Sequence, residues 1–201
     1  PKKNIANVLK QFYQAGIKVK IITGDNPVTT LAIAKQADFK GTEKILTGAE
    51  LLDMPDEELN KSVNDANIFT RMFPEAKLRI IRALKEQHHI VAMTGDGVND
   101  APALKAAHIG IAMGKRGSEI AKQASALVLT DDNLAKMIDA ITMGRKIYSN
   151  LKKAIQYIIS IHVPIILTAS LPLLLNWKYP YIFTPVHVIF LELIMGPTCS
   201  M

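Results

Sequence analysis

Over the first 130 residues, short apolar runs alternate with amphipathic segments, and this pattern predicts an α/β fold. Ile5, Val8, Leu9 and Phe12 have the spacing of one face of a helix, and the segment IKVKII at 17–22 alternates as a strand does. Because helices and strands continue to alternate at this spacing, we expect a parallel sheet. The pattern predicts helices at 4–15, 28–37, 55–64, 74–85, 101–106, 118–125 and from about 132, and strands at 17–22, 44–46, 67–72, 89–93, 108–113 and 126–129.

Residues 151–201 follow a different pattern and hold only 3 of the 24 basic and 1 of the 18 acidic residues. The range 154–177 carries no formal charge, and a helix of that length exceeds a hydrocarbon core roughly 30 Å thick. The alternative is a buried helix of a soluble protein. Lys and Arg residues at 145–153 precede the run, and aromatic residues cluster at 177–181, as at the two interfaces of a membrane. We therefore expect a transmembrane helix with the preceding residues on the cytoplasmic side.

A second apolar run, 183–201, predicts a return crossing and hence a membrane hairpin. Pro164 and Pro172 fall within the first crossing, where each removes a backbone hydrogen bond. Glu192 falls about ten residues into the second crossing. Since an ionisable group at that depth is costly, Glu192 is a candidate functional residue. The alternative is a structural hydrogen bond from Glu192 to His162 or Asn176.

Composition excludes several classes of protein. A chain with 49% hydrophobic and 21% charged residues is too apolar to be a disordered tail. A single cysteine excludes a disulfide scaffold and a cysteine-rich zinc module. The net charge of +4 over residues 1–150 is too small and scattered to indicate nucleic-acid binding, and no P-loop motif occurs. Nucleic acid is therefore not an expected partner.

Two predicted strands end in the same device, Thr-Gly-Asp, at 23–25 and 94–96. In parallel α/β sheets the ligand lies at the carboxyl ends of the strands. A threonine hydroxyl and a glycine N–H can meet phosphate oxygens there, and Asp96, with Asp100 four residues later, suits a magnesium ion that carries phosphate. Asn99 supplies a neutral donor beside them. For 23–26 alone, ordinary turn chemistry is an equal alternative.

Two cations follow on neighbouring elements. Lys77, early in the helix after Pro74, could neutralise a phosphate in the same crevice, and Arg71 ends the preceding strand. The alternative for both is a solvated surface cation.

These motifs, in order and spacing, resemble the second half of the phosphorylation domain of P-type cation-transporting ATPases. The motifs are TGDN (23–26), Arg71 with Lys77, TGDGVNDAPAL (94–104), IGIAMG (109–114) and TDDN (130–133), followed by a tail that begins GRKIY at 144–148. The resemblance implies a haloacid-dehalogenase-like (Rossmann-like) parallel sheet, incomplete, followed by an α-helical transmembrane hairpin. It implies these ranges: a partial phosphorylation domain (1–131), a cytoplasmic stalk helix (132–153), a first transmembrane helix (154–177) and a second, truncated one (183–201).

The resemblance also implies roles for the candidate residues. Asp96 matches the magnesium-binding aspartate, Lys77 the lysine that neutralises the phosphoryl group, and Asp100 a residue that organises the same loop. Thr23, Gly24, Asp25, Arg71 and Asn99, with Lys77, match segments that face the transferred phosphate and the nucleotide. The implied cofactors are Mg²⁺ and ATP, and the implied enzyme is an ion-translocating ATP hydrolase that acts through an aspartyl-phosphate.

Departures from the family pattern limit what we expect of the chain alone. The family's phosphorylated aspartate lies in a D-K-T-G-T motif, which does not occur here. In this fold that segment is the central strand, so we expect a fragment that lacks its nucleophile and is inactive alone. Its expected partners include the missing N-terminal parts of the same pump. The alternatives are a membrane-anchored haloacid-dehalogenase-type phosphatase, whose D-x-D motif is also absent, and a truncated non-catalytic product.

The resemblance leaves the transported ion open. Where calcium and sodium–potassium pumps place carboxylates, this sequence has Ile165 and Gly196, so Glu192 is the intramembrane candidate, with Thr198 and Cys199 near it. Calcium follows from overall likeness to the calcium-pump branch; sodium, potassium, protons and other cations stay open. We expect a multi-pass membrane protein, in the plasma membrane if bacterial, with residues 1–153 cytoplasmic.

Overall fold

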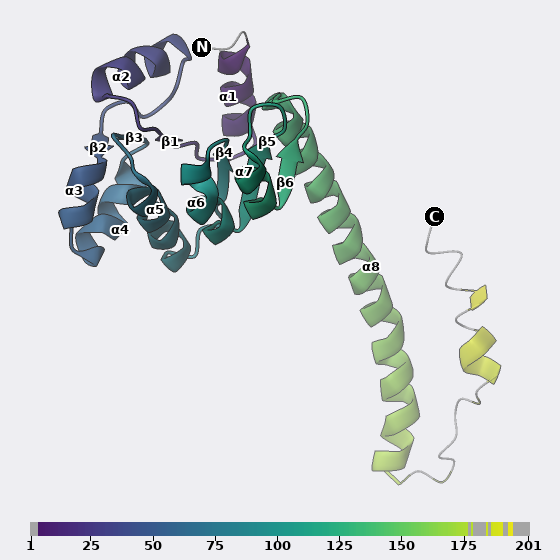
Figure 1. The fold of residues 1–201 in the computed structure, drawn as a ribbon. Coiled ribbons are helices and arrows are strands. Elements are labelled where there is room, and N and C mark those ends of the chain that lie inside the picture. The colour runs from purple at the N-terminus through teal and green to yellow at the C-terminus, as the bar shows by residue number, and fades with distance from the viewer. Residues whose placement is uncertain (1–3, 177, 179–183, 185, 191–192, 195–201) are drawn as a thin grey trace. The chain divides into compact units, whose positions relative to one another are not determined.

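The computed structural model describes residues 4–176, 178, 184, 186–190 and 193–194 (Figure 1). The chain divides into two compact units, Pro1–Ala140 and Ile141–Met201. The helices are α1 (Ile5–Gln14), α2 (Pro27–Gln36), α3 (Gly48–Asp53), α4 (Asp56–Asp65), α5 (Pro74–Glu86), α6 (Ala101–Ala106), α7 (Glu119–Ala124) and α8 (Ala135–Leu174), with a short 3₁₀ turn, η1 (Val98–Asp100). The strands are β1 (Ile21–Ile22), β2 (Ile45–Thr47), β3 (Ile68–Thr70), β4 (Ala92–Gly95), β5 (Ile109–Met113) and β6 (Leu127–Leu129).

Each helix and strand predicted in the first unit is present, but several bounds differ. β3 (Ile68–Thr70) is shorter than the predicted 67–72, and β4 (Ala92–Gly95) lies later in the chain than the predicted 89–93. β1 is shorter than the predicted 17–22, because within it only Ile21 and Ile22 pair with β3. α3 was not predicted, although its sequence carries a start signal. Thr47 Oγ1 accepts a hydrogen bond from the Glu50 N–H, and a Glu50 carboxylate oxygen accepts from the Thr47 N–H at 2.7 Å. This reciprocal pair is a capping box, and its spacing in the sequence could have revealed the helix.

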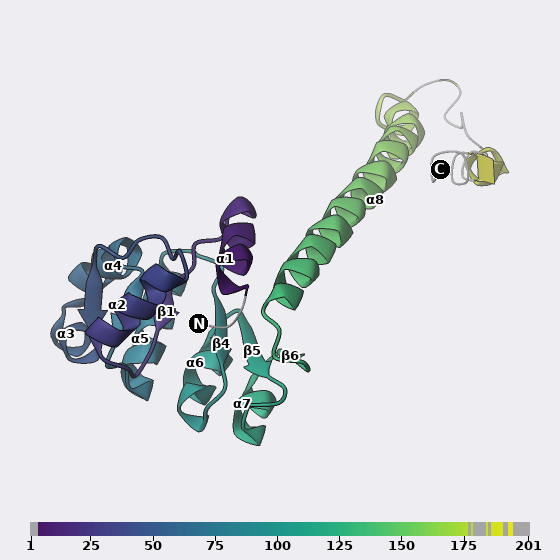
Figure 2. The ribbon, with the colours of Figure 1, turned by 90° about the horizontal axis from the view of Figure 1, so that it is seen from above.

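The strands form two parallel sheets of three, ordered β1-β3-β2 and β4-β5-β6, where the sequence predicted one incomplete parallel sheet. Among the described residues, β1 pairs only with β3 and β4 only with β5, so each sheet ends in an edge strand. The family resemblance predicts that the central strand is not part of this chain, and a division into two sheets is what that prediction would give. Helices α6 and α7 cover one face of the second sheet (Figure 2).

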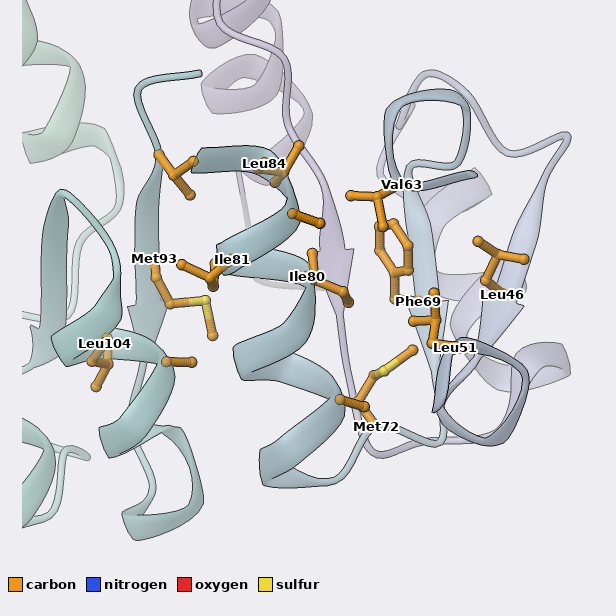
Figure 3. Packing of buried hydrophobic residues seen from close by; sticks show 14 of the residues in the cluster. Leu46, Leu51, Val63, Phe69, Met72, Ile80, Ile81, Leu84, Met93 and Leu104 are labelled. Carbon is orange, nitrogen blue, oxygen red and sulfur yellow. The ribbon is translucent and has the colours of Figure 1, made fainter. Parts of the chain in front are cut away.

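Helix α5 joins the two halves of the core. It packs against α3 and α4 beside the first sheet and against α6 beside the second. Figure 3 shows Ile81 of α5 directed toward Met93 of β4, and Ile80 directed toward the side of Phe69 in β3. Ile80 and Phe69 are fully buried, and Ile81 and Met93 nearly so. The core therefore continues from one sheet to the other through a helix rather than through strand pairing.

Helix α8, which begins at the end of the first unit and continues into the second, is long and apolar enough to cross a membrane, with an 18-residue window of mean hydropathy 1.9. Only 6% of that window is buried, whereas the core helix of a soluble protein is mostly buried. Pro164 and Pro172 lie inside the helix without ending it. Most of the predicted return crossing, and Trp177, Tyr179 and Tyr181, lie outside the described residues.

A lysine stabilises the C-terminal end of α4. Lys20 Nζ donates to the carbonyl oxygens of Val63 at 2.7 Å and Ala66 at 2.5 Å, and to Asn67 Oδ1 at 3.2 Å. The free carbonyl groups at this helix end attract a cation. Burial nevertheless lowers the pKa of Lys20 from 10.5 to about 8, with a further lowering by Lys18 and an opposing effect of Asp65.

Replacement of Lys20 by Met should change how the stability of the chain depends on pH. Between pH 8 and 10.5 the unfolded chain keeps a proton that the folded chain has lost at Lys20, so this residue makes stability rise with pH across that window. The free energy of unfolding of the wild type, minus that of Lys20→Met, should therefore increase from below pH 8 to pH 10.5. Urea unfolding of the chain in detergent measures it. Lys35→Met, on the exposed side of α2, is the control, and an equal pH profile for both variants would contradict the prediction.

Candidate functional site

A cavity of about 340 Å³ lies where the carboxyl ends of β1 and β4 approach each other. β1 and β4 are each an edge strand of their sheet, and each is followed by, or ends in, one of the two Thr-Gly-Asp motifs. The cavity is lined by Ile22, Thr23, Gly24, Lys77, Met93, Thr94, Gly95, Asp96, Asp100 and Met113. The two devices predicted from the sequence thus meet in one place, as expected for a ligand site at the strand ends of an α/β fold.

The loop after β1 is held by its own side chains and by the backbone after β3. Thr23 Oγ1 accepts from the Asp25 N–H at 3.1 Å, and Asn26 caps α2 by accepting from the Thr29 N–H at 2.8 Å. The Arg71 N–H donates to the Asp25 carbonyl at 3.0 Å, and the Met72 N–H donates to the Thr23 carbonyl at the same distance. These hydrogen bonds hold the backbone of Thr23 and Gly24 in place in the wall of the cavity.

In the loop after β4, Asp100 is committed to structural contacts. Its Oδ2 accepts from the backbone N–H groups of Asp96 at 3.3 Å and Gly97 at 3.2 Å. Its Oδ1 accepts from Lys77 Nζ at 2.6 Å, and the two side chains of this ion pair are 11% and 13% exposed. Because both oxygens of Asp100 are occupied, the carboxylate that stays available to a ligand is that of Asp96, which is exposed.

Asp96 fits the donor chemistry of a magnesium site. Mg²⁺ keeps several waters and takes one or two protein carboxylates together with substrate phosphate. Among the described residues, no group of three or more His, Cys, Asp or Glu side chains could enclose a metal ion without such outside ligands. A single exposed carboxylate at the cavity wall therefore suits an ion that arrives with a phosphate.

The structure brings five of the predicted site residues together at the cavity; the other predicted residues do not line it or lie outside the described residues. Those that line it are Thr23, Gly24, Lys77, Asp96 and Asp100. Asp25, Arg71 and Asn99 are exposed nearby in sequence but are not among the lining residues. Glu192, Thr198 and Cys199 lie outside the described residues.

Sequence reasoning missed part of the wall, namely Ile22, Met93 and Met113, whereas Thr94 and Gly95 belong to the predicted Thr-Gly-Asp motif. All three lie at or next to the carboxyl end of a strand, and Met113 ends β5 beside β4. Strand-end position was therefore the signal that could have identified them, because side chains there face the same edge of the sheet as the motif residues.

Comparison with known proteins assigns the fold and site to a class. Residues 1–108 match the family model described as haloacid dehalogenase-like hydrolase. The chain therefore belongs to the haloacid dehalogenase-like hydrolases. Among solved structures, a zinc-transporting PIB-type ATPase in the E2.Pi state is similar with a TM-score of 0.66 and 28% identity, over 85% of this chain and 23% of that one.

Curated relatives that match nearly the whole chain are transport ATPases, so the predicted likeness to P-type cation-transporting ATPases is confirmed. A calcium-transporting ATPase of Bacillus subtilis (strain 168) is 43% identical over 195 residues, or 96% of this chain. The calcium-transporting ATPase 1 of Lactococcus lactis subsp. lactis (strain IL1403) is 40% identical over the same share, and the cation-transporting ATPase pma1 of Synechocystis sp. (strain ATCC 27184 / PCC 6803 / Kazusa) is 41% identical over 100% of it. The chain spans 22% of the length of each.

Replacement of Gly95 by Ala should disturb the site by displacing Asp100. An alanine Cβ at Gly95 would lie 2.6 Å from Asp100 Cβ and 2.9 Å from Asp100 Cγ, so the buried carboxylate would have to move away from Lys77. We expect the free energy of unfolding to fall by about 1–3 kcal/mol.

Gly97→Ala is the matched control for this change, because its Cβ would meet nothing closer than 3.7 Å. It should be neutral or slightly stabilising, since alanine restricts the unfolded chain more than glycine does. Urea unfolding of both variants in detergent measures the difference. Equal stabilities for the two variants would show that Asp100 moves without cost.

Proposed function

We propose that this chain is part of an ATP-driven cation pump and supplies its magnesium- and phosphate-binding loops together with part of the ion pathway. The observation that carries the proposal is the cavity itself, where two strands that each end in Thr-Gly-Asp bring Asp96 close to Lys77 of α5. The family of transport ATPases to which the chain is similar supports the same conclusion.

The residues of the cavity suit phosphoryl transfer, which depends mainly on positioning and charge neutralisation. Thr23 and Gly24 would hold phosphate oxygens through a hydroxyl and a backbone N–H. Lys77, whose ammonium is held by Asp100, would supply positive charge beside the phosphoryl group. Asp96 would hold Mg²⁺, whose chemistry when bound is to neutralise phosphate charge. Asp25, Arg71 and Asn99 would face the nucleotide part of ATP from the rim.

The acceptor of the phosphoryl group would come from outside these 201 residues. The sequence contains no D-K-T-G-T motif, and β1 and β4 are both edge strands beside the cavity. A strand that paired with both edges would carry a carboxylate to the same end of the sheet as Asp96, because parallel strands end together. The chain alone would therefore be inactive, and its first partner would be the rest of the same pump.

The C-terminal part would anchor the pump and carry the ion. We assign residues 1–131 to the phosphorylation domain, 132–153 to a cytoplasmic stalk, and 154–177 and 183–201 to two transmembrane helices of a multi-pass protein. The length and apolar character of α8 support the first crossing. Residues 1–153 would then be cytoplasmic, since Arg145, Lys146, Lys152 and Lys153 precede the apolar run.

Calcium is the cation that we propose for transport, with Glu192 as its ligand and Thr198 and Cys199 near it. Relatives at 40% and 43% identity carry the name calcium-transporting ATPase, which supports this choice. A carboxylate oxygen is a suitable ligand for calcium.

The magnesium role can be tested with Asp96→Asn in the protein expressed from its complete reading frame. Loss of the carboxylate charge should reduce the acid-stable phosphoenzyme formed from ATP on the order of 100-fold. Asp53→Asn, at the exposed end of α3, is the control and should retain wild-type phosphorylation. Unchanged phosphorylation in Asp96→Asn would reject the magnesium role. Hydrolysis of simple phosphomonoesters without a phosphoenzyme from ATP would support the phosphatase alternative instead.

The transport role can be tested with Glu192→Gln in the same protein. If Glu192 binds the transported ion, the calcium concentration for half-maximal ATPase activity should rise about tenfold, which corresponds to about 1.4 kcal/mol of binding free energy. Glu58→Gln, on the exposed face of α4, is the control. An unchanged calcium dependence in Glu192→Gln would leave that residue without a role in ion binding.

A further inference from the structure

Asp132 is a buried carboxylate in an unusual backbone conformation, next to the start of α8. Its side chain is 8% exposed, and its φ of 54° lies in the left-handed region that a residue other than glycine adopts at a cost. Oδ1 accepts from the Lys115 N–H at 3.0 Å, and Oδ2 lies 4.0 Å from Arg116 Nε. The carboxylate is thus directed at the loop 114–118, which connects β5 to α7.

The loop 114–118 is joined by a backbone hydrogen bond to the loop after β4, which carries Asp96. The Ser118 N–H donates to the carbonyl oxygen of Asp96 at 2.8 Å. Since Asp96 carries the available carboxylate of the cavity, the position of its peptide group depends partly on the position of Ser118. The route from Asp132 to the cavity is therefore Asp132 to Lys115, along the loop to Ser118, and from Ser118 to Asp96.

Two glycines of the loop 114–118 lie close to neighbouring backbone. The Gly114 N–H donates to the Leu129 carbonyl at 2.8 Å, and the Gly117 N–H donates to the Met113 carbonyl at 3.1 Å. A Cβ at Gly114 would lie 2.6 Å from Thr130 Cα, and one at Gly117 would lie 2.0 Å from the Met113 carbonyl oxygen. The backbone of the loop is thus held by hydrogen bonds and close contacts at both glycines, and the position of Ser118 depends on these contacts together with the one from Asp132 to Lys115.

The same segment also starts α8. The Asp131 carboxylate accepts from the Asn133 N–H at 3.2 Å, and Asn133 Oδ1 accepts from the Ala135 N–H at 3.0 Å, at the first residue of the helix. Asp132 lies between these two turn-forming residues, so its side chain connects the beginning of α8 to the loop behind Asp96.

We propose that Asp132 is a positioning residue that fixes the loop 114–118, and through Ser118 the backbone of Asp96, relative to the start of α8. The proposal deepens the proposed function and rests on it for the role of Asp96. Asp132 touches neither magnesium nor phosphate in this scheme. It sets where the Asp96 peptide lies, and it couples that position to the helix that leads to the apolar segment.

The first test needs no bound metal and uses amide hydrogen exchange in the protein expressed from its complete reading frame. Asp132→Gly keeps the backbone conformation accessible and removes the carboxylate. Exchange in the peptide that contains Lys115 and Ser118 should then accelerate about tenfold, the factor expected from the loss of one hydrogen bond of typical net strength. Asp132→Asn keeps an oxygen acceptor for the Lys115 N–H and should exchange nearly as slowly as the wild type.

Asp38→Gly is the matched control, since Asp38 also has a φ of 54° but is exposed at the end of α2. It separates the effect of glycine flexibility from that of the lost carboxylate. Faster exchange confined to 96–97 and 114–118 in Asp132→Gly supports the proposal. Faster exchange throughout residues 4–140 would overturn it, because Asp132 would then only maintain the fold, and no change in these peptides would overturn it as well.

The second measurement is the Mg²⁺ concentration for half-maximal phosphoenzyme formation. It should rise about three- to tenfold in Asp132→Gly and stay near the wild-type value in Asp132→Asn and Asp38→Gly, because outer residues tune a metal site by orienting its ligand. If Asp96→Asn leaves phosphorylation unchanged, the proposed function itself fails. If Asp96→Asn abolishes it while Asp132→Gly behaves as Asp38→Gly, the positioning inference alone fails.

Discussion

Helix α5 is the element on which the rest of the first unit depends, because its buried side chains share one hydrophobic cluster with residues of both sheets and no described strand joins the sheets. Its buried face brings Ile80 to the side of β3 and Ile81 to that of β4 (Figure 3). The same helix carries Lys77, whose ammonium binds Asp100 in the wall of the cavity. Packing of one amphipathic helix therefore determines both the continuity of the core and the relative position of the two motif loops. Loss of either member of this nearly buried ion pair would leave the other as an uncompensated charge, which is strongly unfavourable.

The site separates two aspartates that are only four residues apart. Asp100 uses both oxygens within the protein and so shapes the loop, whereas Asp96 points outward with its carboxylate available. The two aspartates differ because of burial. A buried carboxylate needs hydrogen-bond donors from the protein, whereas an exposed one is solvated and can still bind a cation. The loop 114–118 then supports Asp96 from behind through Ser118. The cavity is lined by residues at the ends of several strands, and each strand contributes a small part.

Much of the fold was predictable from the sequence because the local signals agree with one another. Helices α1, α2, α5 and α6 have clear apolar periodicity or a proline at the start, and their boundaries match within one or two residues. β1 was predicted too long, since alternation of apolar residues does not reveal how many of them find a pairing partner. α3 was missed because a six-residue helix has too few turns to show a periodic pattern, although its capping box was visible.

By itself, the sequence determined the alternation of helices and strands, the apolar character of α8, and the motifs that carry Thr23, Asp96 and Lys77. These are properties of neighbouring residues, and short-range spacing is enough to express them. Only the tertiary structure decided which candidates line the cavity, which aspartate is committed to Lys77, and that Asp132 connects to Asp96 through a loop. The reason is physical: such contacts join residues far apart in the chain, and their partners depend on burial and on the meeting of strand ends, which no local pattern encodes.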